Sequence, residues 1–517
     1  MEVKVIFKTA RCVTLEMDDG SVYESDLDRE IYINGSFYKK TRRVIDSVYG
    51  LKPDTEYAIR VKAGEETEIT VKTDYEFVTL DVRDFGAKGD GVSDDTHFIQ
   101  AAIMSCPKKG RVLIPKGVYR VTNLFLKSGL RLELAEGAVL SADTDRKRFP
   151  VLPGLIESYD EKEEYNLGTW EGNPLDCFAA VITGINVENV EIYGRGVIDG
   201  NASQENWWHD PKTRQGAFRP RMIFLNSCGH VVIQGIQVQN SPSWNLHPYF
   251  SHDLRFLDMT ITNPKDSPNT DGLDPESCRA VEIAGVRFSV GDDCVAVKSG
   301  KIYMGSKYKV PSEDILIRQC RMRDGHGSVT LGSEMAGGIR NLTVRDCLFL
   351  HTDRGLRIKT RRGRGKDAVI DGIIFENIRM DHVMTPFVVN SFYYCDPDGF
   401  STYVSSKDPL PVDDGTPDIR TLKFRRIEAA NCHVAGAYLY GLPEKKIQQV
   451  EMEDVRISYA REVKADIPAM LEGVEPVSKM GVFAANIDTL VLKNVTVEGQ
   501  RGEKIVTQHI EHLIEKC

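Results

Sequence analysis

A repeated apolar pattern constrains the fold of this chain more than any other feature. From about residue 190 onward, the chain repeats the order apolar, any residue, apolar, two residues, apolar, any residue, apolar. The copies start at Val231, Leu254, Val281, Ile315, Leu342 and Ile373, and weaker copies start at Leu422, Val450 and Leu490. Each copy is too short to form a core of its own, so it buries its apolar side chains only by stacking on the next copy. The pattern therefore predicts an all-β parallel solenoid.

The cysteines fit the interior of such a stack. The chain has 11 cysteines, an odd number without a C-x-x-C pair, which indicates neither a zinc site nor a disulfide framework. Cys320 and Cys347 occupy the same apolar position in successive copies. We expect the cysteines to be reduced core residues, because free cysteine is among the most buried residue types.

The first seventy-odd residues have a different pattern. Apolar and polar residues alternate in short runs separated by turn residues, which is typical of a small antiparallel sandwich. Residues 50–61 resemble the part of fibronectin type III domains that carries the tyrosine corner, with Tyr57 as the corner residue. We therefore expect a fibronectin type III-like sandwich over residues 1–75 and a solenoid domain over residues 76–517.

Composition limits the classes of partner. With 517 residues and 41% hydrophobic content, the chain can bury more than one core. The net charge of −10 argues against a nucleic-acid partner, and no run of about 18 apolar residues is present to cross a membrane. The N-terminus lacks the features of a secretory signal, so we expect a cytoplasmic protein unless a native leader is absent from this sequence. Nothing in the sequence indicates the oligomeric state.

Polar residues that follow successive repeats suggest a single site. In a stacked solenoid, residues at the same phase of neighbouring coils line up on one outer face. The segments SWNLHP, NTDGLDPE, GDDCVAVKSG, GHGSVTLGSE and RGLRIKT would place there Trp244, His247, Asp271, Asp274, Asp292, Asp293, His326, Arg357 and Lys359. Glycosidic bond cleavage needs one protonated carboxyl and one ionised carboxylate. Crowded acids supply both states, because like charges raise the pKa of at least one of them.

These motifs resemble a known family. The segments NTDG, GDDC, GHG and RIK, in this order and over roughly residues 78–500, resemble the signature of glycoside hydrolase family 28, the polygalacturonases. The resemblance implies a right-handed parallel β-helix that hydrolyses galacturonate-containing oligosaccharides or pectin with inversion, without a metal or other cofactor. It implies that Asp292 is the general acid, that Asp271 and Asp293 hold and activate the water, and that His326 lies beside the acid.

The same resemblance addresses the basic segment 354–366. It implies that Arg357 and Lys359 clasp a galacturonate carboxylate, for which a bidentate Arg is well suited. It also suggests a substrate contact for Tyr394, with Tyr393 as an alternative. Lys298, Trp244, His247 and Asp274 complete the predicted substrate-binding set. The remaining basic side chains could bind further uronates or be solvated: Arg361, Arg362, Arg364 and Lys366.

One departure from the family pattern indicates the mode of action. Endo-acting members usually have Asn in CVAVNSG, whereas this chain has Lys298, as in the exo-acting bacterial members that it resembles. The long segments 204–221 and 381–420 could close one end of a groove, so we expect release of galacturonate from the non-reducing end. Three alternatives stay open: a rhamnogalacturonan or xylogalacturonan hydrolase, a Ca²⁺-dependent pectate lyase, and a non-catalytic glycan-binding solenoid.

Overall fold

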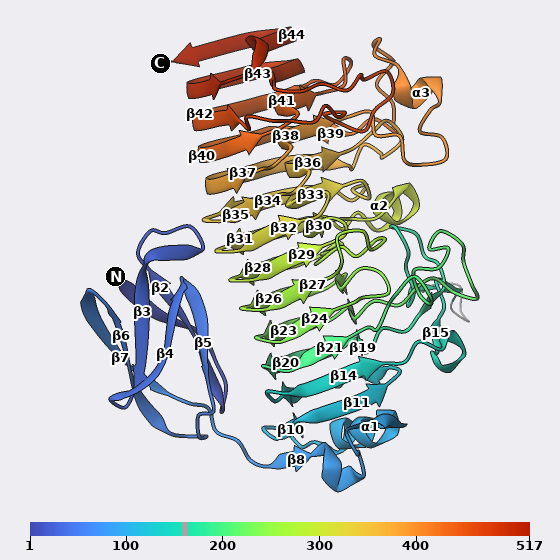
Figure 1. The fold of residues 1–517 in the computed structure, drawn as a ribbon. Coiled ribbons are helices and arrows are strands. Elements are labelled where there is room, and N and C mark those ends of the chain that lie inside the picture. Colours follow the sequence, from blue (N-terminus) through green and yellow to red (C-terminus); the bar gives the residue numbers. More distant parts are fainter. Residues whose placement is uncertain (158–163, 517) are drawn as a thin grey trace.

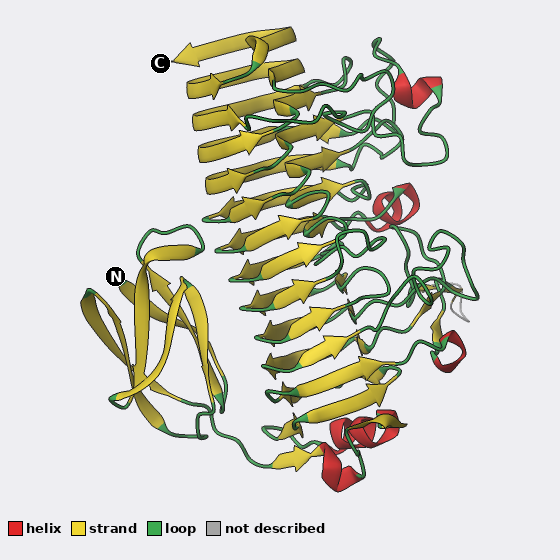
Figure 2. Cartoon of the chain, viewed as in Figure 1, coloured by secondary structure: helices red, strands yellow, loops and turns green. Residues whose placement is uncertain are grey.

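The chain forms a small β-sandwich that packs beside a long parallel β-helix (Figure 1). This architecture comes from a computed structural model that describes residues 1–157 and 164–516. Strands dominate the chain, and the few helices lie at one end of the solenoid and among its loops (Figure 2). Among the described residues, no helix has the length and apolar character needed to span a membrane.

The sandwich has two antiparallel sheets. A three-stranded sheet contains β1 (Glu2–Lys8), β2 (Cys12–Asp18) and β5 (Ile45–Tyr49). A four-stranded sheet contains β4 (Ser36–Arg43), β3 (Glu24–Ile33), β6 (Glu56–Ala63) and β7 (Glu65–Lys72). The hydroxyl of Tyr57 accepts a hydrogen bond of 2.8 Å from the backbone N–H of Lys52, as expected for a tyrosine corner. The predicted fibronectin type III-like sandwich is therefore confirmed.

The solenoid is built from three stacks of parallel strands. The first stack contains β8 (Thr79–Asp81), β10 (Arg111–Ile114), β13 (Arg131–Leu134), β20 (Glu188–Gly194), β23 (Gly229–Gln234), β26 (His252–Leu257), β28 (Arg279–Ala284), β31 (Ser312–Arg318), β34 (Ile339–Arg345), β37 (Val369–Asp381), β40 (Thr421–Cys432), β42 (Ile447–Tyr459) and β43 (Met480–Glu498). The second contains β9 (Asp90–Asp94), β11 (Gly117–Val121), β14 (Ala138–Ala142), β21 (Val197–Asp199), β24 (Gln237–Gln239), β27 (Thr260–Thr262), β29 (Arg287–Val290), β32 (Arg321–Asp324) and β35 (Leu348–Leu350), and it continues in the later long strands.

The third stack positions the candidate site. It contains β12 (Leu124–Phe125), β19 (Ile182–Ile185), β22 (Ile223–Asn226), β25 (Leu246–Tyr249), β30 (Val295–Val297), β33 (Val329–Gly332), β36 (Arg354–Lys359), β38 (Thr385–Asn390), β41 (Ala435–Tyr440) and, after β43, β44 (Arg501–Lys516). Single parallel bridges from Leu246 to Leu273 and from Leu273 to Val295 carry this stack through one coil that lacks a named strand.

The remaining elements are short. The helices are η1 (Val82–Phe85), α1 (Thr96–Ser105), η2 (Arg146–Arg148), α2 (Ile302–Tyr308) and α3 (Thr402–Ser405). The small strands outside the stacks are β15 (Val151–Leu152), β16 (Ile156–Glu157), β17 (Glu164–Tyr165) and β18 (Cys177–Phe178), whereas the short β39 (Asp418–Ile419) pairs in parallel with β37 of the first stack. Helix α1 covers the first coils, and its buried Ile99, Ala102 and Ile103 belong to the main core (Figure 1). A terminal cap of this kind shields the apolar end of a stack from water.

The repeat read from the sequence is the register of the first stack. Its starting residues pair in parallel from coil to coil: Val231, Leu254, Val281, Ile315, Leu342, Ile373, Leu422, Val450 and Leu490. All of these side chains are buried in one continuous core. Cys320 and Cys347 are also buried in it, and every described cysteine is unpaired, with all but Cys395 buried. The predicted parallel β-helix is confirmed.

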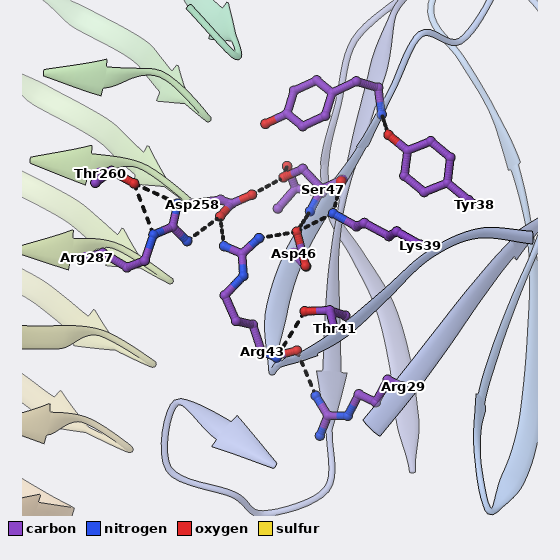
Figure 3. A network of polar contacts seen from close by, with 12 residues as sticks. Arg29, Tyr38, Lys39, Thr41, Arg43, Asp46, Ser47, Asp258, Thr260 and Arg287 are labelled. Atoms are coloured by element: carbon purple, nitrogen blue, oxygen red, sulfur yellow. Dashed lines mark hydrogen bonds and ion pairs between the residues drawn. The ribbon is translucent and has the colours of Figure 1, made fainter. Parts of the chain in front are cut away.

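A polar network joins the sandwich to the solenoid (Figure 3). Arg43 forms ion pairs with Asp46 of the sandwich and with Asp258 of the solenoid. Asp258 also accepts a hydrogen bond of 2.7 Å from the Ser47 hydroxyl and lies 3.1 Å from Arg287. The sandwich lies on the side of the solenoid opposite the loops that carry α2 and α3 (Figure 1).

Candidate active site

The third stack and the segments leading into it line an open cleft with a volume of about 570 Å³. The register of Leu273, Val295, Val329 and Leu356 on consecutive coils brings together the polar residues that precede or follow them. Nine of the predicted residues line this cleft: Trp244, Asp271, Asp292, Asp293, Lys298, His326, Arg357, Lys359 and Tyr394. The structure therefore places these nine residues on one face, as the sequence predicts.

Three carboxylates form the centre of the cleft. Asp271, Asp292 and Asp293 each offer an oxygen atom, and these atoms all lie within 4.8 Å of one another. Burial, followed by the neighbouring carboxylates of Asp292 and Asp274, raises the pKa of Asp271 well above its usual value. The surroundings of Asp271 therefore favour its protonated form.

Asp293 has the opposite charge state. Its side chain is fully buried, and burial alone would raise its pKa. Lys359 Nζ lies 2.9 Å from Asp293 Oδ2, and Arg357 Nη1 lies 3.1 Å from Asp293 Oδ1. These two cations hold the pKa of Asp293 well below its usual range. The cleft therefore combines a carboxylate whose surroundings favour the ionised form, Asp293, with one whose surroundings favour the protonated form, Asp271.

His326 contacts the third carboxylate. Its Nδ1 lies 3.2 Å from Asp292 Oδ1, and its backbone N–H donates a hydrogen bond of 3.1 Å to the Asp292 carbonyl. The hydrogen bond with the Asp292 side chain raises the pKa of His326 above its ordinary value of 6.5. An imidazolium in this position is a hydrogen-bond donor to Asp292 and offers its other ring nitrogen to a ligand.

Lys298 is held at the edge of the carboxylate cluster. Its Nζ lies 3.2 Å from Glu334 and 3.6 Å from Asp274, and it lies 4.4 Å from the centre of the Trp244 ring. Burial would lower the pKa of Lys298, but Glu334 and Asp274 raise it well above its usual value. The ammonium is therefore charged and held by three neighbours, as a site for an anionic group would require.

Comparison of the sequence with known proteins identifies the family of this chain. A model of glycosyl hydrolases family 28 matches residues 152–470, and a model of the rhamnogalacturonase A/epimerase, pectate lyase-like group matches residues 79–132. The chain belongs to glycosyl hydrolases family 28. A probable polygalacturonase of Vitis vinifera is 31% identical over 412 residues, which cover 76% of this chain and 78% of the relative.

Two solved structures resemble this family 28 chain. An exopolygalacturonase of Thermotoga maritima has 25% sequence identity and a TM-score of 0.66, and the match covers 82% of this chain and 93% of that one. A family 28 exopolygalacturonase of Yersinia enterocolitica has 19% identity and a TM-score of 0.71, with 99% of this chain and 98% of that one covered. The similarity to the Yersinia structure extends over the sandwich as well as the solenoid and is a similarity of fold.

Two predicted substrate-binding residues lie beneath the cleft rather than in it. His247 is completely buried, and its Nε2 lies 2.8 Å from Glu276 Oε2. Burial lowers the pKa of His247 well below its ordinary value, so its imidazole is neutral. Asp274 is also completely buried behind Lys298. The expectation that these two side chains contact substrate is not supported, because the coil turns them into the packed layer below the surface.

The structure corrects the interpretation of the basic segment. Arg361, Arg362 and Arg364 are buried and neither solvated nor exposed to a ligand. Arg361 lies 3.2 Å from Asp396, Arg364 lies 2.6 Å from Asp396, and Arg362 donates at 2.6 and 2.9 Å to Glu444. Lys366 remains exposed beside Asp414. Most of the positive charge is therefore neutralised by acids from later coils.

Other predicted contacts need similar revision. Arg357 and Lys359 line the cleft, but both also pair with Asp293, so they act on the charge of the cluster. Tyr393 and Tyr394 both line the cleft. Tyr393 is nearly buried and its ring centre lies 5.6 Å from Lys359, whereas Tyr394 is half-buried and stacks on Phe400 at 4.9 Å.

Inserted segments form the walls of the cleft. Lys301 Nζ lies 3.1 Å from Asp396 and 4.0 Å from Glu171, so it ties together two segments that are far apart in sequence. The Lys301 N–H donates to the Gly172 carbonyl at 3.0 Å, and a Cβ on Gly172 would lie 2.6 Å from that nitrogen. Gly172 therefore permits the close approach that places Glu171 in the cleft.

The segment before β43 forms a further wall of the cleft, which the sequence did not predict. The Ile467 carbonyl accepts a hydrogen bond of 2.8 Å from Arg354, and the Met470 carbonyl accepts one of 2.8 Å from Asn390. Asp466, Ile467 and Met470 line the cleft. The long gap between the weak repeat copies at Val450 and Leu490 was the sequence signal for this inserted segment.

Proposed function

We propose that this family 28 hydrolase cleaves α-1,4-glycosidic bonds in galacturonate-containing pectic chains. The observation that carries the proposal is the cluster of Asp271, Asp292 and Asp293 with two cations on one carboxylate and a histidine on another. A uronate substrate brings its own negative charge to such a cleft, and fixed cations on Lys298, Arg357 and Lys359 offset that charge.

Each carboxylate has a role in the proposed reaction. Asp292 donates a proton to the leaving oxygen, and Asp271 and Asp293 hold the attacking water. Lys359 and Arg357 support this division for Asp293, because they keep it ionised. Burial and the neighbouring carboxylates raise the pKa of Asp271 in the free protein. Variants of the three acids test which carboxyl delivers the proton.

We propose that the anomeric configuration inverts, as the family resemblance implies. The spacing of the acids alone does not support this, because carboxyls of inverting enzymes are usually about 6.5–9.5 Å apart. Here the nearest oxygens lie within 4.8 Å. Two acids that jointly hold one water molecule leave room for direct displacement without a covalent intermediate. Proton NMR of the first product formed tests this step: the β-anomer is expected, and initial release of the α-anomer would contradict inversion.

We propose exo-action from the non-reducing end. The ion pairs of Lys301 with Glu171 and Asp396 connect two inserted segments that line the cleft. Lys298 occupies the position that resembles exo-acting members. Solved structures of two enzymes titled exopolygalacturonase resemble this chain. A cleft whose walls are held together by such ion pairs admits a chain end more readily than the middle of a polymer.

Product analysis tests bond type, direction and mode together. The protein is incubated with homogalacturonan and with tri- and tetragalacturonate reduced at one end, and the early products are separated by chromatography. We expect monomer or dimer from the unreduced end, with a slow fall in polymer viscosity. A ladder of intermediate oligomers with a rapid fall in viscosity would contradict exo-action. Faster turnover of rhamnogalacturonan or xylogalacturonan would reassign the substrate within the family.

A further inference from the structure

A second cluster of ligating side chains lies outside the cleft, where the chain enters three consecutive strands of the first stack. Glu188 begins β20, His230 lies in β23, and His252 and Asp253 begin β26. The parallel register pairs Glu188 with Gly229 and Gly229 with His252, so the cluster spans three coils. All four side chains are substantially exposed, and none lines the catalytic cleft.

The atoms of three of these residues converge. His230, His252 and Asp253 each offer one ligand atom, and these atoms lie within 4.8 Å of one another. Asp253 Oδ2 is 2.9 Å from His252 Nδ1 and 3.7 Å from His230 Nδ1. Bonds of about 2.0–2.2 Å in a tetrahedral zinc site place the ligand atoms roughly 3.4 Å apart. The cluster therefore needs only small side-chain adjustments to surround an ion.

The other ring nitrogen of His252 faces a second acid. His252 Nε2 lies 3.9 Å from Glu188 Oε1, on the side of the ring away from Asp253. A metal-bound histidine usually donates its second N–H to a carboxylate, which fixes the tautomer and orients the ring. Glu188 is placed for this role.

Gly229 makes this arrangement possible. A Cβ at Gly229 would lie 2.5 Å from the Glu188 carboxylate oxygens and 2.6 Å from His252 Cε1. Glycine at this position of the middle coil therefore lets the acid and the imidazole approach each other without either side chain having to move.

We propose that His230, His252 and Asp253 bind a divalent transition-metal ion, Zn²⁺ in particular, with Glu188 orienting His252. Two imidazoles and one carboxylate favour Zn²⁺ over Mg²⁺ or Ca²⁺, which prefer oxygen ligands. Water completes the coordination, because the cluster is open to solvent. The ion joins β23 to β26 and stabilises the stack, since it binds the folded chain and not the unfolded one.

Calorimetric titration of the full chain, freed of metal by chelation, with ZnCl2 tests the proposal. We expect one Zn²⁺ per chain and a rise in Tm with Zn²⁺ concentration. His230→Asn and His252→Asn should abolish the stoichiometric binding, and Glu188→Gln should weaken it about 10–100-fold. Co²⁺ in place of Zn²⁺ should give the visible absorption of a four-coordinate site.

A matched control uses another histidine contact on the surface. His351 and His382 stack at 5.0 Å on neighbouring coils, and His351→Asn should leave Zn²⁺ binding unchanged. Pectic hydrolysis should be the same in the His230→Asn protein, with or without chelator, because the cluster is separate from the cleft. Absence of stoichiometric Zn²⁺ binding, or its persistence in both histidine variants, would overturn the proposal and leave the proposed hydrolase function untouched.

Discussion

His326 and Asp292 contact each other twice, through a side-chain pair of 3.2 Å and through a backbone hydrogen bond of 3.1 Å. The backbone bond fixes the spacing between the turn before β33 and the turn before β30. The side-chain pair raises the pKa of His326, because the nearby carboxylate favours the imidazolium. This one pair of residues thus sets both the distance between the two turns and the charge of the histidine.

This pair predicts a dependence on pH. The hydrogen bond that His326 donates to Asp292 raises the pKa of His326 above 6.5, so the pair stabilises the fold below pH 6.5 and loses this effect as pH rises through the folded-state pKa. His326→Gln should therefore lower Tm more at pH 6 than at pH 8.5. NMR titration should show a lower pKa for His326 in the Asp292→Asn protein. An unchanged pKa in that variant would show that another group causes the shift.

Removal of the proposed acid tests its role. Asp292→Asn should lower kcat by about 10²–10⁴, the usual contribution of a positioned general acid, while oligosaccharide binding is retained. A substrate with a good leaving group needs little protonation and should be hydrolysed by this variant at a partly restored rate. Asp271→Asn and Asp293→Asn should show no such restoration, because the water still needs activation. Equal restoration in all three variants would contradict the assignment.

The cation beside Asp293 is expected to act on substrate and on the cluster. Arg357→Ala should raise KM and lower kcat, because truncation of a desolvated Arg–carboxylate contact costs about 2–5 kcal/mol. The variant also removes one of the two cations that keep Asp293 ionised, so the acid limb of the kcat profile should move to higher pH. Steady-state kinetics between pH 3 and pH 8 measure both effects. A pure KM effect with an unshifted profile would limit Arg357 to binding.

Arg362 is expected to matter for stability rather than for catalysis. Its side chain is 1% exposed and pairs with Glu444, which is 4% exposed. Arg362→Met should destabilise the fold by about 3–5 kcal/mol, because it leaves a buried carboxylate without its partner. KM of the folded fraction should stay the same. Lys366→Met, at a side chain that is 62% exposed, is the control and should change stability by less than about 0.5 kcal/mol.

The ties across the cleft lining predict the product pattern. Lys301→Ala removes the contacts of 3.1 Å to Asp396 and 4.0 Å to Glu171. The walls should then separate more easily, and longer oligomers should appear among early products of homogalacturonan. Chromatography of digests stopped at low conversion measures this change. Release of monomer alone by the variant would show that other contacts exclude the polymer.

The sequence by itself determined the stack and the identity of its polar face. The apolar starts from Val231 to Leu490 recur because every coil needs the same side chains inside, so a local pattern specifies the register. Asp271, Asp292 and His326 follow their strands at the same phase, which made their alignment predictable. Their roles in catalysis stay predictions.

Only the tertiary structure decided which polar side chains face the cleft. His247 and Asp274 lie in two segments whose polar residues have the same spacing as those of the neighbouring coils. Both side chains are nevertheless buried beneath the surface of the cleft. Arg362 pairs with Glu444, which lies 82 residues later in the chain. Arg43 of the sandwich pairs with Asp258 of the solenoid, at a separation of 215 residues. A buried ion pair can be predicted only when the positions of both partners in space are known. A periodic pattern along the chain carries no information on contacts between inserted segments or between domains.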